Sequence, residues 1–229
     1  MELMAQGRAA DVFDLGEGRV LRRYREGGDV AIEARLMLHL EEHGYPVPHV
    51  FDADGADLVL ERIDGGTLFE ELVHEPGQYP RYGRLLGELH ERLHRLSAPG
   101  WLPGDGPTVI HRDLHPQNVI LSERGPVVID WTNACAGLAS VDAAITVILT
   151  LGSDLGIEPA VAEHVEPFRG LFVDAFLETC DADPRDGLEE AVAYRLATTH
   201  NTPDEVRWLR EAAPRCLDRF YLEPREPQR

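Results

Sequence analysis

The feature that most constrains this chain is a polar loop between two apolar runs, followed at a fixed distance by an aspartate. The loop reads His-Arg-Asp-Leu-His-Pro-Gln-Asn over residues 111–118, and Asp130 follows a further apolar run at 127–129. Short apolar runs around a polar segment predict strands joined by a loop. This layout brings Asp113, Asn118 and Asp130 to one loop mouth. A carboxylate that accepts a proton, beside an amide and a carboxylate that can hold a hard cation, is what phosphoryl transfer to a hydroxyl requires.

Composition narrows the class of protein. The 229 residues carry 41 acidic and 22 basic side chains, and the formal net charge of −19 argues against binding to nucleic acid or to anionic membranes. The same charge is compatible with a cationic acceptor or with solubility alone. No export signal or membrane-spanning run is present, and the three cysteines lack metal or redox spacing. We therefore expect a cytoplasmic protein; the sequence carries no signal for its oligomeric state.

All 22 basic residues are arginine, and the sequence contains no lysine. An enzyme that forms a Schiff base needs a lysine amine, and a Walker-type phosphate loop needs a Gly-Lys pair. Both classes are therefore excluded. Any cation that faces a nucleotide phosphate in this protein must be an arginine.

The chain divides into a part rich in predicted strands and a part rich in predicted helices. Glycine turns between apolar runs over residues 1–24 predict three short strands. A helix over 29–43 follows, with Ile32 on its apolar face. After one more strand we place a boundary, which gives a lobe of residues 1–63 and a lobe of residues 64–229.

Beyond that boundary the spacing of apolar residues is helical. The helix expected over about residues 203–222 opens with a capping box from Thr202 to Glu205, with proline at its first position. A leucine-rich face predicts a helix over about residues 80–97. Further helices are expected at about 140–151, 159–180, 184–200 and 203–222.

A small antiparallel sheet with one helix, then a helical part that opens on H-x-D-L-H-x-x-N and I-D-W, resembles the aminoglycoside phosphotransferase-like family of small-molecule kinases. The resemblance covers roughly residues 1–145 and is strongest over 111–131. It implies an α+β, bilobal protein-kinase-like fold, with a small antiparallel-sheet N-lobe and a mostly helical C-lobe. It also implies transfer of the γ-phosphate of ATP or GTP to a hydroxyl of a small molecule, such as an aminoglycoside or another amine-bearing acceptor.

The resemblance assigns roles to the polar loop and the aspartate after it. Asp113 would be the catalytic base that takes the proton of the acceptor hydroxyl. Asn118 and Asp130 would hold Mg²⁺ against the nucleotide phosphates. His111 and His115 are expected to brace the loop rather than to react.

The same resemblance assigns the nucleotide contacts. Arg22 would occupy the position of the family's phosphate-binding lysine, with Glu33 as its ion-pair partner. This is a departure from the family, because the arginine fork is larger and less mobile than an ammonium group. Gly7 lies where the phosphate-covering turn should be, and backbone groups near Glu61 and Ile63 would bind the adenine edge.

Two positions after the loop bear on how the loop is supported. Asp142 matches the acidic residue that caps the loop from a helix in this family, whereas Leu138 stands where an aspartate is expected.

His-Arg-Asp at 111–113 is typical of protein kinases. Only eleven residues separate Asp130 from Asp142, however, which is too short for an activation segment. A small-molecule acceptor is therefore expected rather than a protein.

Two alternatives stay open. His90, Glu91 and His94 form H-E-x-x-H on the predicted helix, the signature of zinc metallopeptidases. Ser97 and Gly100 stand where the extended signature needs a glycine and a third histidine, and the leucine stripe explains this helix as core packing with both histidines on its polar flank. The second alternative is a catalytically weak pseudokinase that binds nucleotide or a partner, which the missing lysine and the modest length favour.

Overall fold

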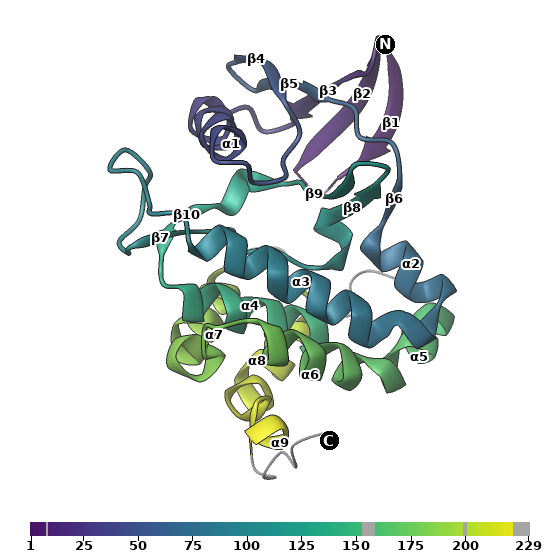
Figure 1. Ribbon diagram of the computed structural model, residues 1–229, viewed down its shortest axis with the longest axis vertical. Coiled ribbons are helices and arrows are strands. Elements are labelled where there is room, and N and C mark those ends of the chain that lie inside the picture. Colours follow the sequence, from purple (N-terminus) through teal and green to yellow (C-terminus); the bar gives the residue numbers. More distant parts are fainter. Residues whose placement is uncertain (8, 153–158, 199–200, 222–229) are drawn as a thin grey trace.

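The computed structural model describes residues 1–7, 9–152, 159–198 and 201–221. A small antiparallel sheet with one helix lies at one end, and the remaining helices stack at the other end (Figure 1). This is the division into sheet and helices expected from the sequence. No helix in the described part of the chain is long and apolar enough to cross a bilayer.

The N-terminal sheet is antiparallel, with the strand order β1-β2-β3-β5-β4. The turn between β2 and β3 is tight because Gly16 and Gly18 adopt left-handed backbone angles, with φ of 75° and 71°. Side chains alternate along β3, so Val20 and Arg22 share one face of the sheet. The strands are β1 (Glu2–Gln6), β2 (Ala10–Gly16), β3 (Arg19–Tyr24), β4 (Val50–Asp54) and β5 (Asp57–Glu61).

Helix α1 (Ala31–Glu42) follows β3. Its start is supported by Asp29, whose carboxylate accepts a hydrogen bond from the first backbone N–H of the helix at 2.8 Å. Ile32 is 49% exposed, so its predicted place on the apolar face was wrong. Its neighbour Glu33 turns inward instead, because it pairs with a cation on β3. The buried face of α1 consists of Ala34, Leu36, Met37 and Leu40.

Two smaller sheets frame the polar loop. β7 (Thr108–Ile110) pairs with β10 (Cys135–Gly137), and β6 (Gly66–Thr67) pairs with β8 (Val119–Ser122), which in turn pairs with β9 (Gly125–Val128). The loop therefore runs from β7 to β8, and Asp130 follows β9 directly. This is the strand–loop–strand layout that the spacing predicts.

The helical part is built around α2 (Leu68–His74), α3 (Tyr79–His94) and α4 (Ala139–Gly152). Tyr82, Leu86, Leu89 and Leu93 of α3 are buried, as its leucine stripe predicts.

The later helices are shorter than predicted. Over 159–180 the chain forms α5 (Pro159–Val165) and α6 (Arg169–Thr179), separated by a 3₁₀ turn that contains Pro167. Proline lacks the N–H that would continue an α-helix. The capping box at Thr202 is present, with Pro203 opening the helix. The remaining helices are α7 (Leu188–Ala197), α8 (Pro203–Glu211) and α9 (Asp218–Tyr221), whereas the predicted ends at 199–200 and 222 lie outside the described residues.

Candidate active site

The polar loop holds two of the expected site residues together. The side-chain nitrogen of Asn118 donates to the backbone oxygen of Asp113 at 2.8 Å and lies 3.5 Å from its Oδ2. Asn118 ends a single 3₁₀ turn, and its backbone oxygen accepts a hydrogen bond from the N–H of Ile129 at 3.0 Å. That bond joins the loop to the segment that carries Asp130.

Asp142 caps this loop from the first turn of α4. Its carboxylate accepts hydrogen bonds from the backbone N–H of His111 at 3.0 Å and of Arg112 at 2.7 Å. Arg112 has φ of 61°, a left-handed conformation that a non-glycine residue adopts at a cost. Burial alone would raise the pKa of Asp142, but the hydrogen bond from His94 and the nearby histidines and backbone N–H groups outweigh it. The pKa of Asp142 is therefore held well below its usual range.

His111 and His115 contact the loop at two different points. The Nε2 atom of the buried His111 lies 3.1 Å from the backbone oxygen of Ile129, and its ring packs on Trp131 with centroids 4.5 Å apart. His115 accepts a hydrogen bond at Nδ1 from the N–H of Gln117, and its Nε2 lies 3.9 Å from Oδ1 of Asp113. His111 thus connects the loop to the end of β9, while His115 lies beside Asp113.

Asp130 faces a cation from the N-terminal sheet. Nη2 of Arg22 lies 2.5 Å from Oδ1 of Asp130, and Nη1 lies 3.0 Å from Oε1 of Glu33. The second contact is the ion pair expected from the sequence. Burial alone would raise the pKa of Asp130, but the guanidinium of Arg22 outweighs that effect and lowers it. Asp130 therefore stays ionised near neutral pH.

Sequence reasoning missed two hydroxyl groups at this ion cluster. The hydroxyl of Tyr24 donates to Glu33 at 2.6 Å, and the hydroxyl of Thr132 donates to Asp130 at 2.9 Å. Thr132 also accepts a hydrogen bond from Arg22 at 3.1 Å. Burial raises the pKa of Glu33, and the charge of Arg22 offsets only part of that rise. Strand alternation could have found Tyr24, because it shares a face of β3 with Arg22.

A second arginine, Arg195 on α7, reaches the loop. Sequence reasoning did not identify it. Nη1 of Arg195 lies 3.9 Å from Oδ1 of Asp113. Its neighbour Tyr194 stacks under Arg112, whose guanidinium carbon is 4.6 Å from the ring centroid. Arg112 also donates to the backbone oxygen of Asn133 at 2.7 Å. No local signal in the sequence marks Arg195, because its position depends on how α7 packs.

The residues expected at the nucleotide base and at the phosphate turn lie around the N-terminal sheet. Gly7 closes the turn after β1 by donating to the backbone oxygen of Ala10 at 2.8 Å, and an added Cβ would lie 3.1 Å from that oxygen. The backbone N–H of Glu61 donates to His49 at 2.8 Å. Ile63 follows β5 and is half-buried. None of these residues has a contact with the polar loop among the described hydrogen bonds.

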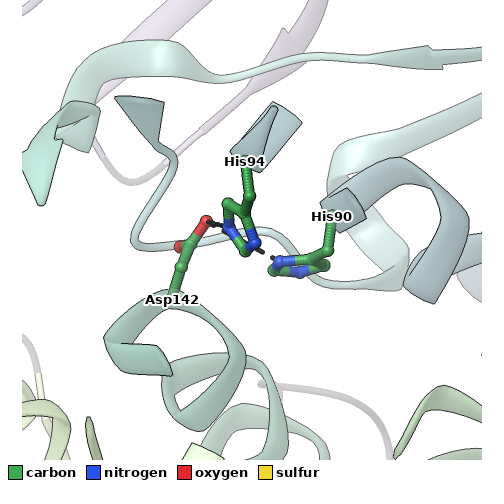
Figure 2. A group of neighbouring side chains, drawn as sticks. All are labelled: His90, His94 and Asp142. Atoms are coloured by element: carbon green, nitrogen blue, oxygen red, sulfur yellow. Dashed lines mark hydrogen bonds and ion pairs between the residues drawn. The ribbon is translucent and has the colours of Figure 1, made fainter. Parts of the chain in front are cut away.

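The two histidines of the H-E-x-x-H sequence point inward, toward Asp142 (Figure 2). Nε2 of His94 lies 3.0 Å from Oδ2 of Asp142, and Nδ1 of His90 lies 3.7 Å from the same oxygen. His90 is fully buried, so the prediction that both histidines lie on the polar flank was wrong. Glu91 lies outside this cluster and pairs with Arg95 at 3.3 Å. The base that zinc peptidase chemistry needs is therefore not beside the histidines.

A hydrogen-bond chain explains why His90 is buried. Thr146 donates its hydroxyl proton to the backbone oxygen of Leu114 at 2.8 Å, so it accepts from Nε2 of His90, 2.9 Å away. Burial lowers the pKa of His90 to about 3, although Asp142 opposes that shift. His90 is thus neutral at physiological pH. The two histidines support the polar loop through Asp142 and Thr146.

Comparison with known proteins identifies the family. The family model described as "Phosphotransferase enzyme family" matches residues 2–108 and 98–177. The serine/threonine-protein kinase PknL of Mycobacterium tuberculosis is 28% identical over 189 residues, which are 81% of this chain and 40% of that protein. A probable serine/threonine-protein kinase BUD32 homolog of Archaeoglobus fulgidus is 25% identical over 150 residues, which are 64% of each chain. The chain thus spans less than two thirds of these relatives.

Solved structures with the same fold include small-molecule kinases. The ADP-bound aminoglycoside phosphotransferase APH(2'')-Ib aligns with a TM-score of 0.61 and 11% identity, over 94% of this chain and 93% of that chain. The ethanolamine kinase of Plasmodium vivax aligns with a TM-score of 0.59 and 13% identity, over 90% of this chain and 79% of that chain. Amicoumacin kinase hAmiN, in complex with AMP-PNP and Ca²⁺, gives a TM-score of 0.52, with 13% identity over 98% of this chain and 90% of that chain.

These likenesses agree with the α+β, bilobal kinase-like architecture expected from the sequence. The family model extends across most of the chain, through the N-terminal sheet, the polar loop and α4. On these grounds the protein belongs to the phosphotransferase enzyme family and has a protein-kinase-like fold.

Proposed function

We propose that this protein transfers the γ-phosphate of ATP or GTP to a hydroxyl of a small molecule, with the nucleotide between residues 1–63 and 64–229. The observation that carries the proposal is the contact of Arg22, on the sheet, with Asp130, beside the polar loop. In this contact a cation of the N-terminal sheet meets the carboxylate that follows β9. The adjacent Asn118–Asp113 contact supplies the remaining groups that phosphoryl transfer requires.

The donor groups fit a magnesium ion, which prefers oxygen ligands. Because the side-chain nitrogen of Asn118 donates to Asp113, its amide oxygen is the atom that would bind a cation. Oδ1 of Asp130 already accepts hydrogen bonds from Arg22 and Thr132, so a cation would bind through Oδ2. When bound, the ion would neutralise charge on the nucleotide phosphates.

The chain's own residues would act by holding and orienting the reactants. Asp113 would accept a hydrogen bond from the acceptor hydroxyl and take its proton as the phosphoryl group moves. Arg22 would face the phosphates while Glu33 and Thr132 fix its guanidinium plane. The N–H of Glu61 is bonded to His49, so the backbone of Ile63 would bind the base edge.

Replacement of Asp113 by asparagine tests this function. Loss of the base should lower kcat for Mg²⁺-dependent ADP or GDP release in the presence of an acceptor by about 10²- to 10⁴-fold. The matched control is Asp105→Asn, because Asp105 is an exposed aspartate in a different loop. Turnover that survives in Asp113→Asn at the wild-type rate would contradict the proposal.

A second candidate is a weak or inactive nucleotide-binding relative. It is favoured by the 2.5 Å contact of Arg22 with Asp130, because the guanidinium competes there with a divalent ion. ATP binding without turnover on any acceptor, in the wild-type protein and in Asp113→Asn alike, would support this candidate.

A further inference from the structure

Two imidazoles and a carboxylate converge between α3 and the first turn of α4 (Figure 2). Each of His90, His94 and Asp142 offers one ligand atom, and the three ligand atoms lie within 4.8 Å of one another. Histidines four residues apart share one face of a helix, so the spacing of the H-E-x-x-H sequence itself brings the two rings together. The carboxylate completes a set of donor atoms that can hold a metal ion.

One ring nitrogen of this cluster has no hydrogen-bond partner among the described residues. It is Nδ1 of His90, which is fully buried. Nε2 of the same ring carries the proton, because it donates to Thr146, whose own hydroxyl donates to Leu114. Nδ1 therefore presents a lone pair, and it faces Oδ2 of Asp142 at 3.7 Å. Two electron-rich atoms that face each other in a dry interior repel, whereas a cation between them would bond to both.

The ligands are in the protonation states that a metal ion needs. Burial lowers the pKa of His90 to about 3, so in the metal-free protein this ring gains no proton near neutral pH. In spite of burial, the hydrogen bonds from His94 and from the backbone N–H of His111 keep Asp142 ionised. Neutral imidazole and ionised carboxylate are the forms that bind metals. A cation can therefore bind without first displacing a proton from His90 or Asp142.

The spacing and the kind of donor atom fit zinc. Zinc bonds of about 2.1 Å at tetrahedral angles separate the ligand atoms by about 3.4 Å. Oδ2 of Asp142 lies 3.0 Å from Nε2 of His94 and 3.7 Å from Nδ1 of His90, on either side of that value. The two ring nitrogens would close to it as the rings turn about the ion. Imidazole suits zinc, whereas Mg²⁺ and Ca²⁺ prefer oxygen ligands alone.

Neighbouring groups already orient these ligands. Histidines that bind a metal usually donate their other ring N–H to an oxygen atom, as Nε2 of His90 does to Thr146 at 2.9 Å. The carboxylate of Asp142 is fixed by the two backbone N–H groups that it caps. The side chains of His90 and Asp142 are 0% exposed, and that of His94 is 9% exposed. An ion would therefore enter on the side of His94 and would be shielded from bulk water.

We propose that His90, His94 and Asp142 form a zinc-binding site that joins α3 to α4, with a water molecule as the fourth ligand. Zinc would replace the hydrogen bond between His94 and Asp142, and neutral His94 would carry its proton on Nδ1 instead of Nε2. The ion would stabilise the fold rather than hydrolyse a substrate, because the glutamate of the H-E-x-x-H sequence lies outside the cluster. The site is separate from the Mg²⁺ ligands proposed above and does not depend on phosphotransfer.

Metal binding is measured on the full chain after metal has been removed with EDTA. Wild-type protein should then bind one equivalent of Zn²⁺ and melt at a higher temperature. Co²⁺ in place of zinc should give the strong visible absorption of a tetrahedral site, and Mg²⁺ at the same concentration should displace neither ion. Wild-type protein that binds no zinc, or that exchanges it for Mg²⁺, would overturn the proposal.

Two ligand variants locate the site. His90→Gln keeps a donor for Thr146 but has no imidazole, and His94→Gln removes the ligand nearest to solvent. Each should weaken zinc affinity by more than about 100-fold, because loss of an outer partner alone costs about 10- to 100-fold. Thr146→Val removes such an outer partner and should fall within that smaller range. The matched control is His74→Gln, which changes an exposed histidine on α2 and should keep the wild-type affinity.

Nitrogen NMR of the histidine rings decides the case independently of the variants. Zinc should shift the signals of Nδ1 of His90 and Nε2 of His94 in the wild-type protein, and melting temperatures show which variants fold. Zinc bound equally well by wild type and by both folded ligand variants lies elsewhere on the acidic surface and overturns the site. Unchanged ring signals on addition of zinc overturn it as well. None of these measurements requires turnover, so the phosphotransfer proposal is judged separately.

Discussion

At the scale of single residues, Arg22 contacts oxygen atoms of three residues from two segments of the chain. They belong to Glu33 on α1, to Asp130 after β9 and to Thr132 just beyond it. Burial would lower the pKa of Arg22, but the two carboxylates outweigh it and raise the pKa, so the side chain remains charged. A lysine could supply the charge but not the planar fork that reaches two carboxylates together.

Removal of this guanidinium should therefore destabilise the fold. Arg22→Met keeps most of the stem but leaves the carboxylate of Glu33, which is 8% exposed, without its cation. We expect a loss of about 3 kcal/mol in the free energy of unfolding, measured by urea denaturation. Arg23→Met is the control, since Arg23 makes an exposed ion pair with Asp57 and its replacement should cost much less stability.

The double variant Arg22→Met/Glu33→Gln tests the cause of that loss. With glutamine at position 33, no buried charge is left without a partner. At least half of the lost stability should therefore return. The ion pair is not the reason for the effect if the double variant loses as much unfolding free energy as Arg22→Met and Glu33→Gln lose together.

His90 should make stability depend on pH. Its folded pKa, about 3, lies below the ordinary value of 6.5, so the unfolded chain binds more protons between these limits. Stability contributed by neutral His90 is complete above pH 6.5 and declines as the pH falls toward 3. Between pH 8 and pH 5 this amounts to about 2 kcal/mol.

The measurement is urea unfolding of wild type and His90→Gln across that pH range. Glutamine can still donate to Thr146, so the variant should fold but lose the dependence on pH. The exposed His74 provides a matched control as His74→Gln, which should keep the wild-type slope. A slope in His90→Gln equal to that of the wild type would contradict the assignment.

The sequence, through its family resemblance, predicted the Arg22–Glu33 pair, whereas helical periodicity placed the exposed Ile32 on the inner face of the helix. The sequence did not predict contacts that depend on how distant helices pack. The burial of His90 depends on Thr146 and Asp142 from a helix about 50 residues later, which no local pattern reveals. The contact of Arg195 with Asp113 depends in the same way on the packing of α7.

At the scale of elements, α3 and α6 approach each other closely through two glycines. A Cβ on Gly83 would lie 2.3 Å from the backbone oxygen of Phe172, and one on Gly87 would lie 2.8 Å from the Cβ of Thr179. No side chain fits in either place without moving a helix. This contact fixes α6, which carries Arg169 and Phe172.

Gly83→Ala should therefore destabilise the protein in spite of its better helix propensity. Alanine favours a helix by about 1 kcal/mol over glycine, but the clash with backbone should leave a net loss of about 2 kcal/mol. Gly100→Ala is the control, since nothing lies within 4 Å of its added Cβ. Thermal unfolding compares the stability of both variants with that of the wild type. A Gly83→Ala protein more stable than wild type would show that α3 and α6 can move apart freely.

Element prediction succeeded where a residue carries its own boundary signal. Thr202 and Glu205 form the capping box of α8 as predicted, because each bonds to the other within one turn, and Pro203 occupies the first helical position. The helix predicted over 159–180 was interrupted, and Pro167 was the available signal. Helical periodicity continues through that proline, which is why the break was missed.

At the scale of the whole molecule, few described hydrogen bonds join the N-terminal sheet and α1 to the segment after β9. The main ones are those of Arg22 with Asp130 and Thr132, beside which the hydroxyl oxygens of Tyr24 and Thr132 lie 2.6 Å apart. A nucleotide with its cation would add contacts across this same boundary. Ligand binding and stability of the whole fold should therefore be linked.

Mg²⁺ with ATP should raise the unfolding free energy by about 2.7 kcal/mol at a ligand concentration one hundred times Kd. Asp130→Asn should remove the part of this gain that depends on Mg²⁺, because the amide is a weaker cation ligand than a carboxylate. Thermal shift with and without Mg²⁺ measures that part, and Asp105→Asn should keep it. An undiminished Mg²⁺ effect in Asp130→Asn would exclude Asp130 as a ligand.

The arginine at position 22 has a practical consequence for chemical proteomics. If nucleotide binds beside Arg22 as proposed, reagents that acylate a lysine amine will find none there, because the sequence has no lysine and guanidinium groups stay protonated and react poorly with acylating probes. Surveys that identify ATP-dependent proteins through lysine capture will pass over this protein. Photoaffinity analogues, which insert into any neighbouring bond, are the appropriate labels.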